Sequence, residues 1–342
     1  MTIEQIKDKL KSKEYDFLRT DKNLGNNIII LTLGGSHAYG TNNEGSDLDI
    51  RGCALNSKMQ ILTNENFEQF VNNETDTTIY AFNKLVALLS NTNPNTIEML
   101  GNKPEYYFYV SPIGQELIDN AHLFLSKRAC HSFGGYANQQ LYRLNQKAAH
   151  QMSQSELEKH ILKTLEFMQT DFTKKYTPHE DDSMKLYIDK AVQEGYDTEI
   201  FMDVNLHHYP LRDYCSMWNE LQNTVRQYGK IGKRNEKAIE HGKIAKHSMH
   251  LIRLYMMCLD ILEKERIITY REDEHDLLMD IRNGKYLDGN DQPIPEFFEM
   301  VNDYEKRLDY AKKNTSLPDN PNYKAINEFV ASVNERVVKG EI

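Results

Sequence analysis

Residues 34–52 read Gly-Gly-Ser-His-Ala-Tyr-Gly-Thr-Asn-Asn-Glu-Gly-Ser-Asp-Leu-Asp-Ile-Arg-Gly. The stretch opens with a glycine-rich turn that ends in Ser36, and after ten intervening residues it reaches two aspartates at alternate positions, Asp47 and Asp49. Gly34 and Gly35 can adopt backbone angles that are closed to other residues, so a ligand can approach the main chain closely. The pattern predicts a phosphate-binding turn beside a pair of metal-binding carboxylates.

The apolar run Ile-Ile-Ile-Leu-Thr-Leu comes directly before the turn. Its β-branched residues and its flanking turn residues predict a buried strand over 27–33. A helix that opens near Ser36 would turn its free N–H groups and positive dipole end toward an anion. We therefore expect Gly34, Gly35 and Ser36 to bind phosphate groups, with the Ser36 hydroxyl as a further donor.

Apolar and polar residues alternate from Asp47 onward, which predicts a second strand over 47–55. Residues two apart point to the same face of a strand, so the carboxylates of Asp47 and Asp49 can share divalent cations. Two such ions roughly 3.5–4 Å apart stabilise the attacking and leaving oxygens of a phosphoryl displacement. Oxygen ligands favour Mg²⁺ or Mn²⁺ over zinc.

This chemistry usually uses a third carboxylate, and the next strand offers two candidates. Asp76 opens that apolar strand, which we expect to run into a helix over 84–89, and Glu74 lies two residues earlier with the same side-chain parity. We favour Asp76, with Glu74 as the alternative.

The pattern Gly-Ser, ten residues, Asp-x-Asp resembles the signature of the DNA polymerase β-like nucleotidyltransferase superfamily. The longer string over 35–52 is similar to a narrower branch, the predicted nucleotidyltransferases called RlaP-type, or RNA-repair-pathway-like, proteins. Two later segments also match this branch: Asn-Pro-Asn-Thr-Ile-Glu-Met-Leu over 93–100 and Lys-His-Ser-Met-His-Leu-Ile-Arg-Leu over 246–254. These blocks run from about residue 30 to about residue 285, most of the chain.

The resemblance implies a metal-dependent nucleotidyltransferase. Such an enzyme moves a nucleoside monophosphate from a nucleoside triphosphate to an acceptor hydroxyl and releases pyrophosphate, with Mg²⁺ or Mn²⁺ as cofactor. The resemblance gives Asp47, Asp49 and Asp76 catalytic, metal-binding roles, and the third acid can accept the proton of the attacking hydroxyl. The branch name implies an RNA end as acceptor.

Other functions fit the same residues. The acceptor hydroxyl can belong to a protein or a small molecule, and a non-catalytic nucleotide sensor can share the fold. The formal charge of −10 argues against a protein that coats nucleic acid by bulk electrostatics. The sequence also has no RNP-like motif, KH loop or zinc knuckle.

The pattern predicts an α+β fold. Residues 1–125 should form a nucleotidyltransferase core domain, with a surface helix over 3–18 and then a small mixed β-sheet that has helices on one face. Pro94 fits the first turn of a helix that Asn93 caps. Residues 126–342 should form a mainly α-helical domain that contributes to the cleft. Helical spacing is expected over 133–150, 153–172, 183–194, 211–227, 236–264, 273–283, 294–314 and 322–338.

The expected helix over 236–264 has two faces. At 100° per residue, four apolar residues share a stripe that should be buried: Ala245, Met249, Ile252 and Met256. An adjacent stripe is cationic: Lys243, Lys246, His250 and Arg253. We expect Lys246, His250 and Arg253 to bind the nucleotide or an anionic acceptor, and a solvated rim is the alternative. Eight Lys and Arg residues concentrate over 226–253, against two glutamates.

Several other residues have two interpretations. Arg51 shares the strand parity of Asp49, so it can contact a phosphate or pair with an acid. Tyr39 and His37 should shape the turn or contact the nucleotide. Lys84 and Glu98 match the branch, yet ordinary helix positions explain them as well.

No stretch has the layout of a signal peptide or a membrane span, so we expect a cytoplasmic protein with no membrane partner. Four cysteines with no Cys-x-x-Cys spacing are expected to be buried, reduced thiols rather than a zinc site.

Overall fold

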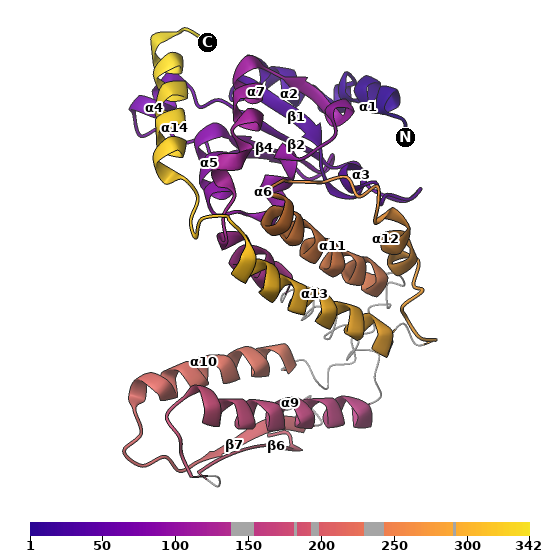
Figure 1. Ribbon diagram of the computed structural model, residues 1–342, viewed down its shortest axis with the longest axis vertical. Coiled ribbons are helices and arrows are strands. Elements are labelled where there is room, and N and C mark those ends of the chain that lie inside the picture. The colour runs from indigo at the N-terminus through magenta and orange to yellow at the C-terminus, as the bar shows by residue number, and fades with distance from the viewer. Residues whose placement is uncertain (138–153, 181–182, 193–197, 229–242, 290–291) are drawn as a thin grey trace. The chain divides into compact units, whose positions relative to one another are not determined.

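A computed structural model describes residues 1–137, 154–180, 183–192, 198–228, 243–289 and 292–342 (Figure 1). The chain divides into two compact units. The first contains Met1–Leu141, Ala245–Asp288 and Pro293–Ile342, and the second contains Tyr142–Ile244 and Gly289–Gln292. This division differs from the expected boundary after residue 125, because the C-terminal helices share a unit with the sheet.

A mixed five-stranded sheet forms the centre of the first unit. Its strands, in the order β3-β4-β2-β1-β5, are β3 (Gln69–Asn72), β4 (Thr77–Ala81), β2 (Ile50–Ala54), β1 (Ile28–Leu33) and β5 (Tyr107–Val110). The β2–β4 pair is parallel, and the other three pairs are antiparallel. The predicted α+β class with a small mixed sheet is confirmed.

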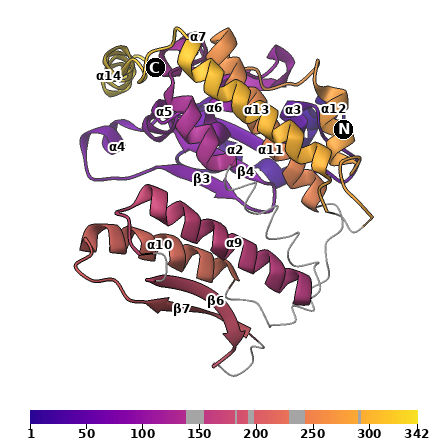
Figure 2. The same cartoon turned by 60° about the horizontal axis from the view of Figure 1, so that its bottom comes forward.

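Helices cover both faces of the sheet. The helices of the first unit are α1 (Ile3–Leu10), α2 (Phe17–Thr20), α3 (Gly35–Tyr39), α4 (Lys58–Leu62), α5 (Phe82–Ser90), α6 (Pro94–Ile97), α7 (Pro112–Asp119), α11 (Lys243–Lys264), α12 (His275–Arg282), α13 (Pro295–Asn314) and α14 (Tyr323–Lys339). Residues 128–137 are also helical, and short 3-10 turns occupy Lys13–Tyr15, Gly25–Asn27, Glu98–Leu100, Pro104–Tyr106 and Ala121–Phe124. In Figures 1 and 2, α11 and α13 run side by side.

The sheet separates two apolar clusters, and β1 contributes to both. Ile28, Leu31 and Leu33 pack with α1 and α2, whereas Ile29 and Ile30 pack with α5, α7 and α11. The two consecutive isoleucines share a face because the β1–β2 register shifts between Ile28 and Ile30. A strand buried on both faces reads as a continuous apolar run, which explains why 28–33 was recognisable. The expectation of helices on one face only was wrong.

Several boundaries also differ from the prediction. The Asp-x-Asp strand begins at Ile50 rather than at residue 47, and the following strand begins at Thr77. The expected helix over 3–18 consists of α1, a 3-10 turn and α2. The predicted cap of α6 is confirmed, since the Asn93 side chain accepts from the Asn95 N–H.

The described part of the second unit is a hairpin with two helices. Strands β6 (Met184–Lys190) and β7 (Thr198–Val204) pair antiparallel, and α9 (Gln154–Lys175) and α10 (Leu211–Tyr228) supply its apolar core together with β6. Figure 2 shows both helices on one side of the hairpin. The expected helix over 183–194 was wrong. Apolar residues alternate through β6, and the pairing with β7 stabilises the strand.

Parts of several predictions lie outside the described residues: 138–150 of the helix over 133–150, residue 153 of the helix over 153–172, 193–194 of the helix over 183–194, 236–242 of the helix over 236–264, and 229–242 of the basic region. No helix among the described residues is long and apolar enough to cross a membrane.

Candidate active site

Three segments that carry the predicted site residues meet at one edge of the sheet. The antiparallel β1–β2 pair and the parallel β2–β4 pair both reach Ile50, so β1 ends where β2 and β4 begin. The Gly34 N–H donates to the Asp49 carbonyl at 2.9 Å, and the Ile50 N–H donates to the Asp76 carbonyl at 3.1 Å. Backbone hydrogen bonds thus place the glycine turn, Asp49 and Asp76 side by side.

The two glycines of the turn leave space for the side chains of Asp49 and Arg51. Gly35 has φ +56°, and a Cβ there would lie 1.9 Å from Asp49 Oδ2. A Cβ on Gly34 would lie 2.6 Å from Arg51 Cγ. The Asp49 carboxylate therefore lies directly against the main chain of the turn, which explains why neither position can carry a side chain.

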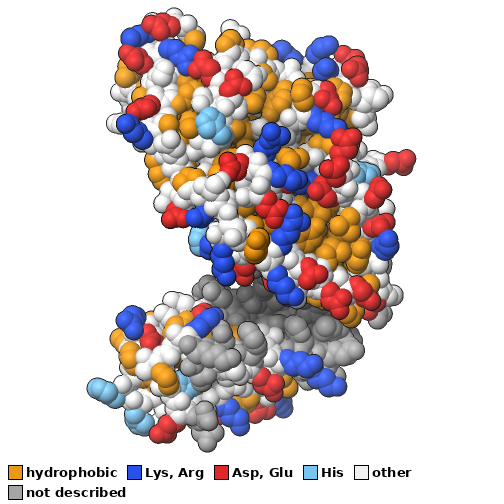
Figure 3. Space-filling model, viewed as in Figure 1, with side chains coloured by type: hydrophobic (Ala, Val, Ile, Leu, Met, Phe, Trp, Pro, Cys, Tyr) orange, Lys and Arg blue, Asp and Glu red, His pale blue; other side chains and the backbone are white. Residues whose placement is uncertain are grey.

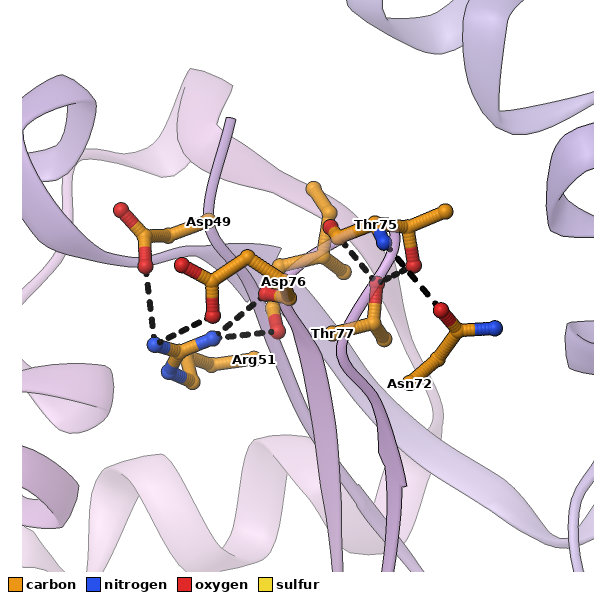
Figure 4. A network of polar contacts seen from close by, with 7 residues as sticks. Asp49, Arg51, Asn72, Thr75, Asp76 and Thr77 are labelled. Carbon is orange, nitrogen blue, oxygen red and sulfur yellow. Dashed lines mark hydrogen bonds and ion pairs between the residues drawn. The ribbon is translucent and has the colours of Figure 1, made fainter. Parts of the chain in front are cut away.

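Arg51 joins the two acids of this edge (Figure 4). Its Nη2 lies 2.9 Å from Asp49 Oδ1 and 3.5 Å from Asp76 Oδ1. Its Nη1 donates to the Asp76 carbonyl at 2.7 Å. Arg51 was expected either to contact a phosphate or to pair with an acid, and the structure contains the ion pair. Of the two candidate third acids, both of which are exposed, Asp76 is the one that pairs with Arg51.

The remaining candidate acid is Asp47. Asp47 is exposed, in the loop before β2. Within the described ranges, no three His, Cys, Asp or Glu side chains lie close enough to hold a metal ion. Ser36 is half-buried on α3, and its carbonyl accepts from the Thr41 N–H. The expectation that Asp47, Asp49 and Asp76 bind metal together stays a prediction.

The pKa of the Asp49 carboxyl group is shifted from its ordinary value. Burial raises the pKa of Asp49 to about 6, and Asp76 adds to the rise, while Arg51 and Lys246 oppose it. Two neighbouring carboxylates repel each other, and a divalent cation bound between them would relieve that repulsion. Asp49 and Asp76 therefore fit a hard cation such as Mg²⁺ or Mn²⁺ by donor type and by charge.

A buried ionic cluster lies behind the turn. The Arg253 guanidinium lies 3.5 Å from the centroid of the Tyr39 ring, and its Nη1 lies 3.7 Å from Glu98 Oε2. His250 Nδ1 lies 2.6 Å from Arg253 Nη2. Only 2% of Arg253 and 5% of Glu98 are exposed. Arg253 therefore contacts the inner side of α3 through Tyr39, so its position favours a role in holding the turn.

The cationic face of α11 thus has two parts. Lys246 is exposed, and it lies near enough to Asp49 to lower the pKa of that carboxyl. Arg253, two turns later, is buried among side chains of the first unit. The predicted apolar stripe, from Ala245 to Met256, is buried as expected.

Sequence reasoning missed two residues that hold the turn. Asn102 Nδ2 donates to Thr32 Oγ1 at 2.7 Å and to the Leu33 carbonyl at 2.8 Å, which fixes the end of β1. The Tyr270 ring covers Gly40, where a Cβ would lie 2.5 Å from Tyr270 Cε2. Both residues lie in irregular segments, where no periodic pattern marks them.

A family model supplies the decisive comparison. The model described as RlaP, an RNA repair pathway DNA polymerase beta family, matches residues 5–178. The chain belongs to this family. The comparison gave no match among curated proteins and none among solved structures.

Membership of the RlaP family supports a nucleotidyltransferase-type function. The matched span contains the glycine turn and the three candidate acids, whereas Lys246, Arg253 and Tyr270 lie beyond it.

Proposed function

We propose that this RlaP-family protein transfers a nucleoside monophosphate from a nucleoside triphosphate to a hydroxyl at an RNA end and releases pyrophosphate. The observation that carries the proposal is the position of the Asp49 carboxylate, which lies against Gly35 of the turn and beside Asp76. This edge would bring a triphosphate and two carboxylates together in one place.

Each residue would have a defined task. The N–H groups near Gly34 and Gly35 and the Ser36 hydroxyl would bind phosphate oxygens. Asp49 and Asp76, with Asp47 from the preceding loop, would hold Mg²⁺ or Mn²⁺, which would neutralise phosphate charge and orient the reacting oxygens. Catalysis would then depend on positioning and on charge stabilisation rather than on a covalent intermediate.

Two side chains would adjust their contacts when a nucleotide binds. Arg51 pairs with both acids, so a divalent cation would compete with its guanidinium. A freed guanidinium could then meet a phosphate oxygen, the other interpretation of this residue. Lys246 would supply a second positive charge from α11, on the side of Asp49.

The choice of RNA as acceptor rests on the family description, an RNA repair pathway. In Figure 3, acidic and basic side chains lie interspersed over the first unit on the face shown. With a formal charge of −10, recognition of an RNA end would depend on local contacts near the turn rather than on bulk electrostatics.

The test is label transfer from α-labelled nucleoside triphosphates, with Mg²⁺ or Mn²⁺ and RNA that has a free 3′ hydroxyl. We expect label on the RNA with the wild-type protein and none with Asp49→Asn. Asp8→Asn is the matched control, since it removes an exposed carboxylate on α1 that pairs with Lys11. Transfer that survives Asp49→Asn would refute the role of this carboxylate.

Two other results would change the proposal. Label on protein or on small alcohols, with none on RNA, would change the acceptor and keep the chemistry. Nucleotide binding without transfer to any acceptor would indicate a sensor on the same fold.

A further inference from the structure

Two cysteines from distant parts of the sequence meet inside the first unit. Cys130 belongs to the helical residues 128–137, and Cys258 belongs to α11. Cys130 packs against the apolar cluster that contains Cys258, and each of the two thiols shifts the pKa of the other. Cys258 is fully buried, whereas Cys130 is partly exposed. The pair therefore has one thiol that solvent can reach and one that lies behind it.

The environment favours negative charge on the outer sulfur. The neighbouring Cys258 thiol lowers the pKa of Cys130, and Lys312 adds to this effect, whereas burial and Asp309 oppose it. The Cys130 thiol and burial raise the pKa of Cys258. Cys258 thus keeps its proton. A thiolate is the nucleophilic form of cysteine.

A cavity gives access to this sulfur. It has a volume of about 290 Å³, and its walls come from residues 128–137, α11 and α13. The lining includes Cys130, His131, Tyr255, Glu305 and Lys312. The space is large enough for a small oxidant to reach Cys130 from solvent, while Cys258 is not among the lining residues.

We propose that Cys130 and Cys258 form a redox modification site, in which Cys130 reacts with a hydroperoxide such as hydrogen peroxide and Cys258 resolves the product as a disulfide. An accessible, activated thiol next to a resolving cysteine is the arrangement of redox-sensing pairs. Neither residue belongs to the edge of the sheet that carries Asp49. The site is therefore separate from the acids that are proposed to act in the transfer reaction.

The reaction balances in two steps. The Cys130 thiolate attacks one peroxide oxygen, so an S–O bond forms and the O–O bond breaks; the released hydroxide takes a proton and becomes water. The Cys258 sulfur then attacks the Cys130 sulfenic acid, so an S–S bond forms and the S–O bond breaks. The Cys258 proton leaves with the hydroxyl group as a second water. Two electrons pass from the thiols to the peroxide, and a dithiol reductant reverses the change.

The other two cysteines supply internal controls. Cys53 is fully buried in β2, and burial alone raises its pKa. Cys215 lies exposed on α10 in the second unit, contrary to the expectation that all four thiols are buried. An exposed thiol without a resolving neighbour should advance to sulfinic and sulfonic acid rather than stop at a disulfide.

The experiment treats the full-length protein with increasing hydrogen peroxide, blocks free thiols by alkylation, and maps the products by intact-mass and peptide mass spectrometry. We expect the Cys215→Ser protein, before alkylation, to weigh two hydrogen atoms less after oxidation and to regain that mass with dithiothreitol; its digest should yield a peptide cross-linked between Cys130 and Cys258. Cys130→Ser should abolish the cross-link. In Cys258→Ser, Cys130 should become a sulfenic acid that dimedone traps.

Two results would overturn the proposal. The first is over-oxidation of Cys130 in the Cys215→Ser protein without any cross-linked peptide. The second is a cross-link that forms only after denaturation. Because Cys258 is buried and its substitution can disturb the core, Cys258→Ala is a second variant with a smaller side chain. The cross-linked peptide needs neither substitution, so it tests the pair in the native core.

Discussion

Gly35→Ala tests whether the Asp49 carboxylate lies where the candidate site requires it. The new Cβ would lie 1.9 Å from Asp49 Oδ2 and 2.5 Å from its Cγ. Ordinary contact begins at 3.4 Å, so the carboxylate would have to retreat by about 1.5 Å. Because a 1 Å misplacement at a reacting centre can cost about 100-fold in rate, we expect nucleotidyl transfer to fall at least that far.

Gly284→Ala is the matched control for backbone strain. Gly284 has φ +85°, also in the left-handed region, yet a Cβ there would meet only Leu287 Cδ1, at 3.8 Å. Both variants carry the left-handed cost of a non-glycine residue, about 1–2 kcal/mol. Only Gly35→Ala adds the collision with Asp49. We therefore expect near wild-type transfer from Gly284→Ala, with a similar or smaller loss of stability.

A double-mutant cycle measures the collision without using activity. Asp49→Ala removes the carboxylate, so Gly35→Ala should cost less unfolding free energy in that background than in the wild type. Urea denaturation of the four proteins gives the coupling free energy, and label transfer gives the rate. Equal costs in both backgrounds, or transfer by Gly35→Ala close to the wild-type rate, would refute the placement of Asp49.

Three further predictions follow from the first unit. Lys246→Ala should raise the KM for nucleoside triphosphate and leave the free energy of unfolding unchanged. Arg253→Ala should lower the free energy of unfolding by about 3–5 kcal/mol, because it leaves Glu98 buried without its ion-pair partner. Steady-state kinetics and urea denaturation check this, and a stability loss from Lys246→Ala with a KM change alone from Arg253→Ala would contradict it. Burial raises the pKa of Glu98 to about 7, although Arg253 opposes the rise, so ionised Glu98 destabilises the fold: the free energy of unfolding should fall, relative to Glu98→Gln, as the pH rises from about 4.5 to 7. Denaturation curves at pH 5 and pH 8 that show a constant difference would contradict this. Gly114→Ala should prevent stable folding, because its Cβ would lie 2.1 Å from the Ile29 carbonyl oxygen, whereas Gly134→Ala, with no atom within 4 Å, should keep its thermal transition.

The sequence predicted those parts of the fold that depend on contacts between residues close together in the chain. The run before Gly34 is buried on both faces, so its composition alone predicted β1, and Pro94 with Asn93 predicted the start of α6. The short strands β3 and β5 were not predicted because each is an outermost strand of the sheet, and such a strand depends on a pairing partner elsewhere in the chain. In β6 the alternating pattern was present, but helical spacing on both sides masked it.

The sequence predicted the motif residues of the candidate site, but not their burial or their contacts. Spacing identified the turn, Asp47 and Asp49, but it could not show that Asp47 is exposed while Asp49 lies against Gly35. Helical periodicity placed Lys246 and Arg253 on one stripe without separating a solvated charge from a buried one. That difference comes from Tyr39 and Glu98, which pack against Arg253 from other elements.

Lys246 and Arg253 connect α11 to the turn in two different ways. Lys246 and Arg253 are seven residues apart, about two helical turns, so they share one side of the helix. At one point on that side the buried guanidinium contacts Tyr39 of α3, and at the other the exposed ammonium lies toward Asp49. A rotation or shift of α11 would therefore move both the support of the turn and the charge beside its acid. For this reason the effects of Lys246→Ala and Arg253→Ala should be measured separately and then together, because a non-additive double variant would show that α11 couples the two.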